Sequence, residues 1–94
     1  MREQHKEFQK ITNEMFDLYV KKNNDYSSTN NDNIGSLGAK GIFVRMWDKI
    51  SRLRSLVWEE REAQVKDETV VDTIMDLGIY CIIFLIWMRG KWGK

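Results

Sequence analysis

Seven charged side chains stand among apolar residues in the second half of the chain, at spacings that suit the binding of a phosphate and a metal ion together. They are Arg45, Asp48, Lys49, Arg52, Glu68, Asp72 and Asp76. The three cations lie four and three residues apart, and the last three acids lie four and four apart. Spacings of three and four place side chains on one face of a helix. The sequence therefore predicts a basic face on one helix and an acidic stripe on the next.

Charged groups on core-forming helices are costly unless they are paired or bind a ligand. An anion on the basic face and a divalent cation on the acidic stripe would meet that cost together, and a nucleotide phosphate with Mg²⁺ has this distribution of charge. Carboxylates of Glu68, Asp72 and Asp76 could supply oxygen ligands to Mg²⁺. Two alternatives stay open: a solvated face at the start of a helix, and a structural network of salt bridges with the cations.

The basic face suits phosphate in particular, because the planar fork of arginine makes bidentate contacts with phosphate oxygens. Arg45, Lys49 and Arg52 are the predicted phosphate ligands. Asp48 could orient Arg52, four residues later, or join the metal ligands. An ordinary helix surface with salt bridges would also explain this pattern.

A second candidate region joins the first helix to a long polar loop. Tyr26 could stack on a base, Lys22 could meet a phosphate, and Asp25 could help to close the segment over the sugar. A turn or a helix C-cap explains the polar residues of this segment almost equally well.

The apolar periodicity predicts an all-α fold in a single domain, residues 1–94, with three main helices over about 3–22, 42–62 and 67–89. A loop of nearly twenty residues, 23–41, is rich in Asn, Ser and Gly. The predicted buried face of the second helix consists of Phe43, Met46, Trp47, Ile50, Leu53 and Val57.

The third helix is apolar nearly all round from Ile79 to Met88, which a three-helix monomer could not cover. We therefore expect a homo-oligomer, a dimer or higher, in the form of a helical bundle. The uncharged run Leu77–Met88 is shorter than a bilayer span of roughly 20 residues, so we expect a soluble cytoplasmic protein without membrane contact. Cys81 is expected to be a buried thiol.

Composition argues against several classes of function. The net charge is only +1, with acids and bases interspersed, which does not suit direct readout of DNA or RNA. The chain has no glycine-rich phosphate loop after a strand, no zinc-spaced Cys and His residues, and no Ser–His–Asp candidate.

Three strings of this sequence resemble the nucleotide modification associated domain 1 family of phages and bacteria. They are 22–26 (KNNDY), 41–53 (GIFVRMWDKISRL) and 67–80 (DETVVDTIMDLGIY). That family is similar in turn to the all-α nucleoside triphosphate pyrophosphatases of the MazG and dimeric dUTPase type. The resemblance implies a MazG-like helical oligomer, with a nucleotide between helices and Mg²⁺ on acids from two of them.

The sequence departs from the MazG pattern in two places. MazG-type enzymes carry a Glu-Glu-x-x-Glu motif on one helix and Glu-x-x-Asp on the next. Here the second helix keeps only Asp48, and the third reads Glu68-x-x-x-Asp72. Both departures argue against hydrolysis but not against nucleotide binding.

The leading hypothesis is a nucleotide-binding protein that acts on (deoxy)nucleoside polyphosphates as a Mg²⁺-dependent pyrophosphohydrolase. Asp48, Glu68 and Asp72 are the candidate catalytic residues, and Glu68, Asp72 and Asp76 the candidate metal ligands. An alternative is a non-catalytic phage-type binder that sequesters a nucleotide signal, such as a cyclic nucleotide of host defence. A structural helical assembly module is the third possibility.

Overall fold

The computed structural model describes the backbone of residues 1–26, 37–64 and 69–94, and it divides the chain into two compact units, Met1–Asn31 and Asp32–Lys94. The elements of the described residues are helical, without strands, which confirms the predicted all-α class.

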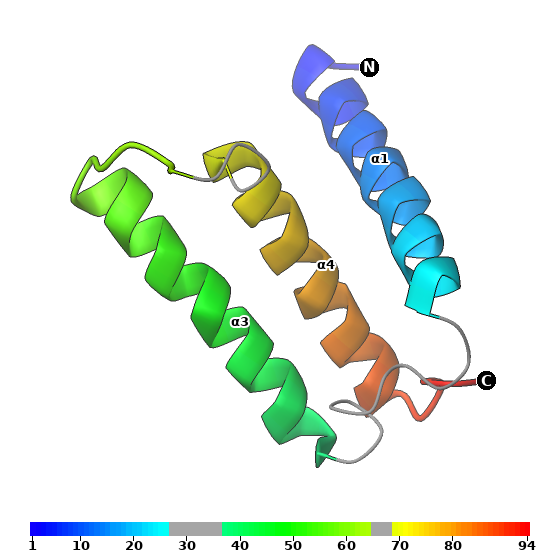
Figure 1. The fold of residues 1–94 in the computed structure, drawn as a ribbon. Coiled ribbons are helices and arrows are strands. Elements are labelled where there is room, and N and C mark those ends of the chain that lie inside the picture. Colours follow the sequence, from blue (N-terminus) through cyan, green and yellow to red (C-terminus); the bar gives the residue numbers. More distant parts are fainter. Residues whose placement is uncertain (27–36, 65–68) are drawn as a thin grey trace. The chain divides into compact units, whose positions relative to one another are not determined.

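The first unit contains α1, Glu3–Tyr26 (Figure 1). The backbone carbonyl of Arg2 accepts hydrogen bonds from the amides of His5 and Lys6, so the first turn forms directly after it. Glu3 in that turn complements the positive end of the helix dipole. The helix continues four residues beyond the predicted end at residue 22, so residues 23–26 are helical and do not begin the loop.

The second unit is a helical hairpin of α3, Ala39–Leu53, and α4, Val70–Met88 (Figure 1). α3 passes without a break into a turn of π-helix, Arg54–Trp58. There the amide of Glu59 donates to the carbonyl of Arg54, five residues earlier. The predicted second helix, 42–62, therefore begins three residues too late and extends four residues too far. Residues 65–68, which include the predicted start of the third helix at 67, lie outside the described residues.

α3 begins at a glycine for two physical reasons. Gly38 has a φ of +57°, which L side chains rarely adopt. A Cβ on Gly38 would also lie 2.8 Å from Cζ2 of Trp87, close to the end of α4. The beginning of α3 is thus held against the end of α4, as expected for two antiparallel helices.

Both ends of α4 carry well-formed caps. At its start, Thr69 and Asp72 form a capping box. At its end, the amide of Gly90 donates to Trp87 and the amide of Lys91 donates to Ile86, with Gly90 at a φ of +71°. These two bonds make a Schellman motif, which satisfies carbonyls that the helix leaves open.

The described core lies along the line where α3 and α4 meet. Its buried apolar side chains are Ile42, Ile79 and Ile83, and Ile42 has no exposed surface. Thr73 is buried as well, and its hydroxyl donates to the carbonyl of Thr69 at 2.7 Å, so this polar group has a partner.

Two predictions about burial are wrong for the single chain. Phe43, Trp47, Ile50 and Val57, expected on the buried face of the second helix, are exposed, because Ile42 rather than Phe43 faces α4. Cys81, expected to be buried, is an exposed free cysteine.

α4 is also long and apolar enough to cross a membrane, by length and composition alone. The uncharged run of twelve residues begins only at Leu77, whereas the helix itself begins at Val70. The soluble, cytoplasmic location stays a prediction.

Candidate functional site

The basic face of α3 and the acidic stripe of α4 lie in the same hairpin. Gly38 contacts Trp87, and Lys49 pairs with Asp76, so eleven residues separate the two contacts on each helix. The same antiparallel register brings Arg52 level with Thr73 and with the Asp72 beside it. One predicted cation, Lys49, therefore meets one predicted acid, Asp76, across the two helices.

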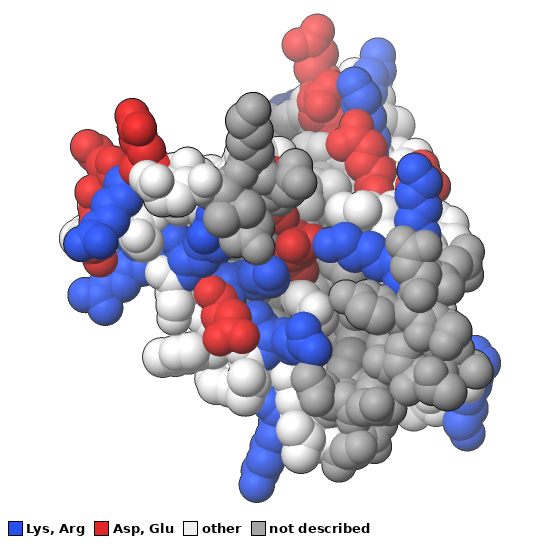
Figure 2. All heavy atoms as spheres, in the orientation of Figure 1, with Lys and Arg blue, Asp and Glu red and all other residues white. Residues whose placement is uncertain are grey.

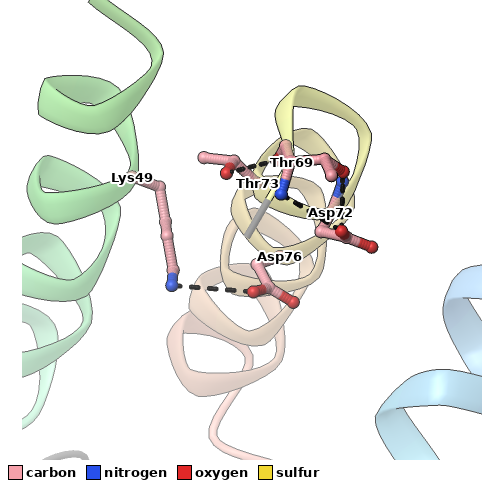
Figure 3. Close-up of polar contacts among 5 residues, drawn as sticks. All are labelled: Lys49, Thr69, Asp72, Thr73 and Asp76. Carbon is pink, nitrogen blue, oxygen red and sulfur yellow. Dashed lines mark hydrogen bonds and ion pairs between the residues drawn. The ribbon is translucent and has the colours of Figure 1, made fainter. Parts of the chain in front are cut away.

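The contact that joins the two helices is an ion pair. Nζ of Lys49 lies 3.6 Å from Oδ2 of Asp76, and the two side chains are 28% and 22% exposed (Figure 3). At this distance and exposure the pair is a Coulombic contact rather than a short hydrogen bond. It places a cation of the basic face directly beside an acid of the stripe.

Asp72 serves the start of its own helix. Its Oδ2 accepts hydrogen bonds from the amide of Thr69 at 3.2 Å and from the Thr69 hydroxyl at 2.6 Å. The amide of Asp72 donates in return to the Thr69 hydroxyl at 3.3 Å. In Figure 3 the Asp72 carboxylate accordingly turns back to Thr69, while that of Asp76 extends to Lys49. A capping role for Asp72 was not predicted, although Thr69-x-x-Asp72 is a recognisable capping pattern.

The remaining charges of α3 border this line. Arg52 is half-buried, and Arg45 and Asp48 are exposed. Arg45, Lys49 and Arg52 follow helical spacing, so they share one side of α3. Figure 2 shows basic and acidic side chains mixed over α3 and the neighbouring part of α4. We refer to Arg45, Asp48, Lys49, Arg52, Asp72 and Asp76 as the charged face.

Few of the described side chains could bind a magnesium ion. Within the described part of the chain, no group of three His, Cys, Asp or Glu side chains is placed to hold a metal. Glu68, the third predicted ligand, lies outside the described residues. Mg²⁺ commonly takes only one or two protein carboxylates together with water and substrate phosphates. Asp72 and Asp76, one helical turn apart, have the donor chemistry for that arrangement.

The predicted residues of the first unit lie in the last turns of α1. Lys22 is exposed there, and the side chains of Asp25 and Tyr26 lie outside the described residues. The helical backbone of this segment corrects the prediction that it is a loop. Its closure over a nucleotide stays a prediction.

Comparisons with models of protein families, with curated proteins and with solved structures gave no significant match. The resemblance to the nucleotide modification associated domain 1 family thus rests on the three sequence strings alone.

Proposed function

We propose that the charged face binds the phosphates of a (deoxy)nucleoside polyphosphate, and that the protein acts on this ligand as a Mg²⁺-dependent pyrophosphohydrolase with a MazG-like fold. The observation that carries the proposal is the 3.6 Å contact between Lys49 and Asp76. It supports the proposal because Lys49, a predicted phosphate ligand, and Asp76, a predicted metal ligand, come from different helices.

Each side chain has a role that follows from its chemistry. Arg45, Lys49 and Arg52 neutralise phosphate charge, and the two arginines can each contact two oxygens. A polyphosphate offers Lys49 an alternative anion, which leaves the Asp76 carboxylate available to a cation. Asp48, exposed on the same helix, is the candidate to position water.

Magnesium would be held by Asp76 and Asp72, with Glu68 as the third predicted ligand, and it would supply polarisation of a phosphoryl oxygen. For Lys22, Asp25 and Tyr26, which belong to the first unit, contact with sugar and base stays a prediction from the sequence.

A second function, sequestration of a nucleotide signal without turnover, is favoured by one specific observation. Both described acids of the stripe have roles that need no metal, since Asp76 pairs with Lys49 and Asp72 caps α4. A purely structural hairpin would use the same two contacts, and it differs from both proposals in binding no nucleotide.

The test is incubation with a panel of ribo- and deoxynucleoside triphosphates plus Mg²⁺, followed by chromatography for monophosphate and pyrophosphate. Calorimetric titration with the same nucleotides and with cyclic dinucleotides, with and without EDTA, measures binding. Charge-assisted hydrogen bonds contribute about 1.5–3 kcal/mol. We therefore expect Arg45→Ala to weaken binding by roughly 10-fold to 100-fold.

The outcomes separate the functions. Turnover lost in Asp76→Asn with binding retained supports the pyrophosphohydrolase. Binding that persists in EDTA, with no product from any nucleotide, supports sequestration. If no nucleotide binds, both proposals are wrong and the structural hairpin remains.

A further inference from the structure

The charged face is electrically balanced. Its cations are Arg45, Lys49 and Arg52, and its acids are Asp48, Asp72 and Asp76. Equal numbers of positive and negative side chains sum to zero charge. A balanced face does not attract an anion through a long-range field, as a purely basic patch does. An anion that binds here must therefore replace contacts that the protein already makes with itself.

One such contact lies between the two helices. Lys49 of α3 pairs with Asp76 of α4 at 3.6 Å between Nζ and Oδ2 (Figure 3). Both side chains are less than a third exposed, and Ile79, one turn after Asp76, belongs to the buried core. Water can therefore replace the partner of either charge only in part. Removing one partner of such a pair costs more than it does at an open surface.

We propose that the Lys49–Asp76 pair is a latch, which keeps the charged face closed to a free polyphosphate and to a free divalent cation and opens to the two together. The inference rests on the proposed function and adds to it how the same site is regulated. The ligand that the latch selects is a magnesium–polyphosphate complex rather than either component.

The selection follows from the exchange of partners. Free polyphosphate gives Lys49 new oxygen partners but takes a cation away from Asp76. Free Mg²⁺ gives Asp76 a new partner but takes an anion away from Lys49. A magnesium–polyphosphate complex supplies the anion and the cation in one step, so that neither member of the pair loses its counter-charge. Each component therefore strengthens the binding of the other, by the same factor in both directions.

Asp76 rather than Asp72 is the carboxylate on which the latch acts. The Asp72 carboxylate accepts a hydrogen bond of 2.6 Å from the Thr69 hydroxyl of its own helix, and a phosphate on Lys49 does not change that contact (Figure 3). Asp76, in contrast, pairs with a cation of α3 that a phosphate can take over. Since Mg²⁺ uses only one or two protein carboxylates when substrate phosphates supply further oxygens, the release of Asp76 changes a large share of the donor set.

The test is calorimetric titration of the full chain with tripolyphosphate, which carries the phosphate charge without a base or a sugar. The affinity for free tripolyphosphate is measured in EDTA, and the affinity for the same probe is measured again with excess Mg²⁺. In the wild-type chain we expect Mg²⁺ to raise this affinity at least about fivefold, at the lower end of the range for coupled sites.

Asp76→Asn separates the latch from the ordinary attraction between Mg²⁺ and phosphate. The substitution removes the carboxylate that competes for Lys49. Free tripolyphosphate in EDTA should therefore bind this variant at least about fivefold more tightly than the wild-type chain. Glu62→Gln is the matched control, because it removes the same charge from an exposed acid outside the charged face. Screening by salt should keep its effect on this affinity within about twofold.

Lys49→Met tests the other half of the latch. Without the lysine, Asp76 loses the cation that competes with a metal, and Mg²⁺ alone should bind at least about fivefold more tightly than to the wild-type chain. Lys91→Met removes an exposed lysine outside the charged face and should leave the affinity for Mg²⁺ within about twofold. Circular dichroism of every variant checks that helicity is retained.

The outcomes distinguish the latch from the proposed function. Equal effects of Asp76→Asn and Glu62→Gln on free tripolyphosphate, or no gain in Mg²⁺ affinity from Lys49→Met, would overturn the latch. If nucleotides bind while these variants behave like their controls, the proposed function stands without it. If neither tripolyphosphate nor any nucleotide binds the wild-type chain in Mg²⁺, both proposals are wrong.

Discussion

Replacing Asp72 by alanine removes two things at once, a candidate metal ligand and half of the capping box of α4. The carboxylate accepts two hydrogen bonds from Thr69, at 3.2 and 2.6 Å, and the Thr69 hydroxyl accepts one from the Asp72 amide at 3.3 Å. Any loss of activity in Asp72→Ala would therefore include the effect of a less stable fold.

Loss of a helix N-cap typically costs about 1 kcal/mol, within a range of roughly 0.5–2. The capping box is exposed, so water replaces part of each lost bond and the typical value applies. For a domain of this size, about 1 kcal/mol lowers the melting temperature by about 4–8 °C. We expect Asp72→Ala and Thr69→Ala each to show a decrease of this order, in thermal unfolding followed by circular dichroism.

The two substitutions should not be additive, because each breaks the same reciprocal bonds. The double variant should be only slightly less stable than either single variant, which corresponds to a coupling of at least about 0.5 kcal/mol. If the two effects instead add to within about 0.3 kcal/mol, or if neither variant melts earlier, the capping box does not stabilise α4 as argued.

The same pair of variants separates stability from chemistry. Thr69→Ala keeps the Asp72 carboxylate but loses the cap, so it is the matched control for any assay of turnover. An enzyme that uses Asp72 should lose turnover in Asp72→Ala and keep most of it in Thr69→Ala. Equal losses in both variants would show that Asp72 acts through the helix start alone.

Three further predictions concern the hairpin. Ile42→Ala should destabilise the fold by about 2–5 kcal/mol, because the side chain is fully buried. Val44→Ala, on the exposed side of α3, should change the free energy of unfolding by less than about 1 kcal/mol. Equal effects of the two substitutions in urea denaturation would refute the described core. Gly38→Ala should lower the melting temperature more than Gly90→Ala. Both glycines have a positive φ, but only Gly38 lies against a ring, that of Trp87. The reverse order of melting temperatures in scanning calorimetry would contradict this packing. Lys49→Met should lower the free energy of unfolding by about 1 kcal/mol or less, because the Lys49–Asp76 pair is partly exposed. This difference should disappear in high salt. A larger decrease that does not depend on salt would mean that the pair is more deeply buried than described.

The sequence was sufficient for the all-α class and for placing Lys49 and Asp76 on charged helix faces. Spacings of three and four are local properties of a helix, so the shared faces of Arg45 with Lys49, and of Asp72 with Asp76, could be derived without coordinates. The partner of each charge could not, since the pairing of Lys49 with Asp76 depends on the antiparallel register that Gly38 and Trp87 establish.

The burial of α3 was the main error of the sequence reasoning. Helical spacing predicts Phe43, Trp47 and Ile50 on the buried face of this helix. Ile42, one position away, occupies the contact with α4, and periodicity alone cannot show which of two adjacent apolar stripes faces the partner helix. The end of α3 was also misjudged, because no composition signal marks a π turn.

That π turn has a consequence for how the length of this segment can vary. Closing a turn over five residues, as Glu59 does with Arg54, accommodates one residue more than the regular helix needs. Deleting a single residue from Arg54–Trp58 would return the segment to ordinary α geometry and leave every upstream side chain in its present phase. A deletion between Arg45 and Arg52 would instead rotate half of the helix by about 100°. The end of α3 is therefore the position where insertions and deletions can accumulate without disturbing the hairpin.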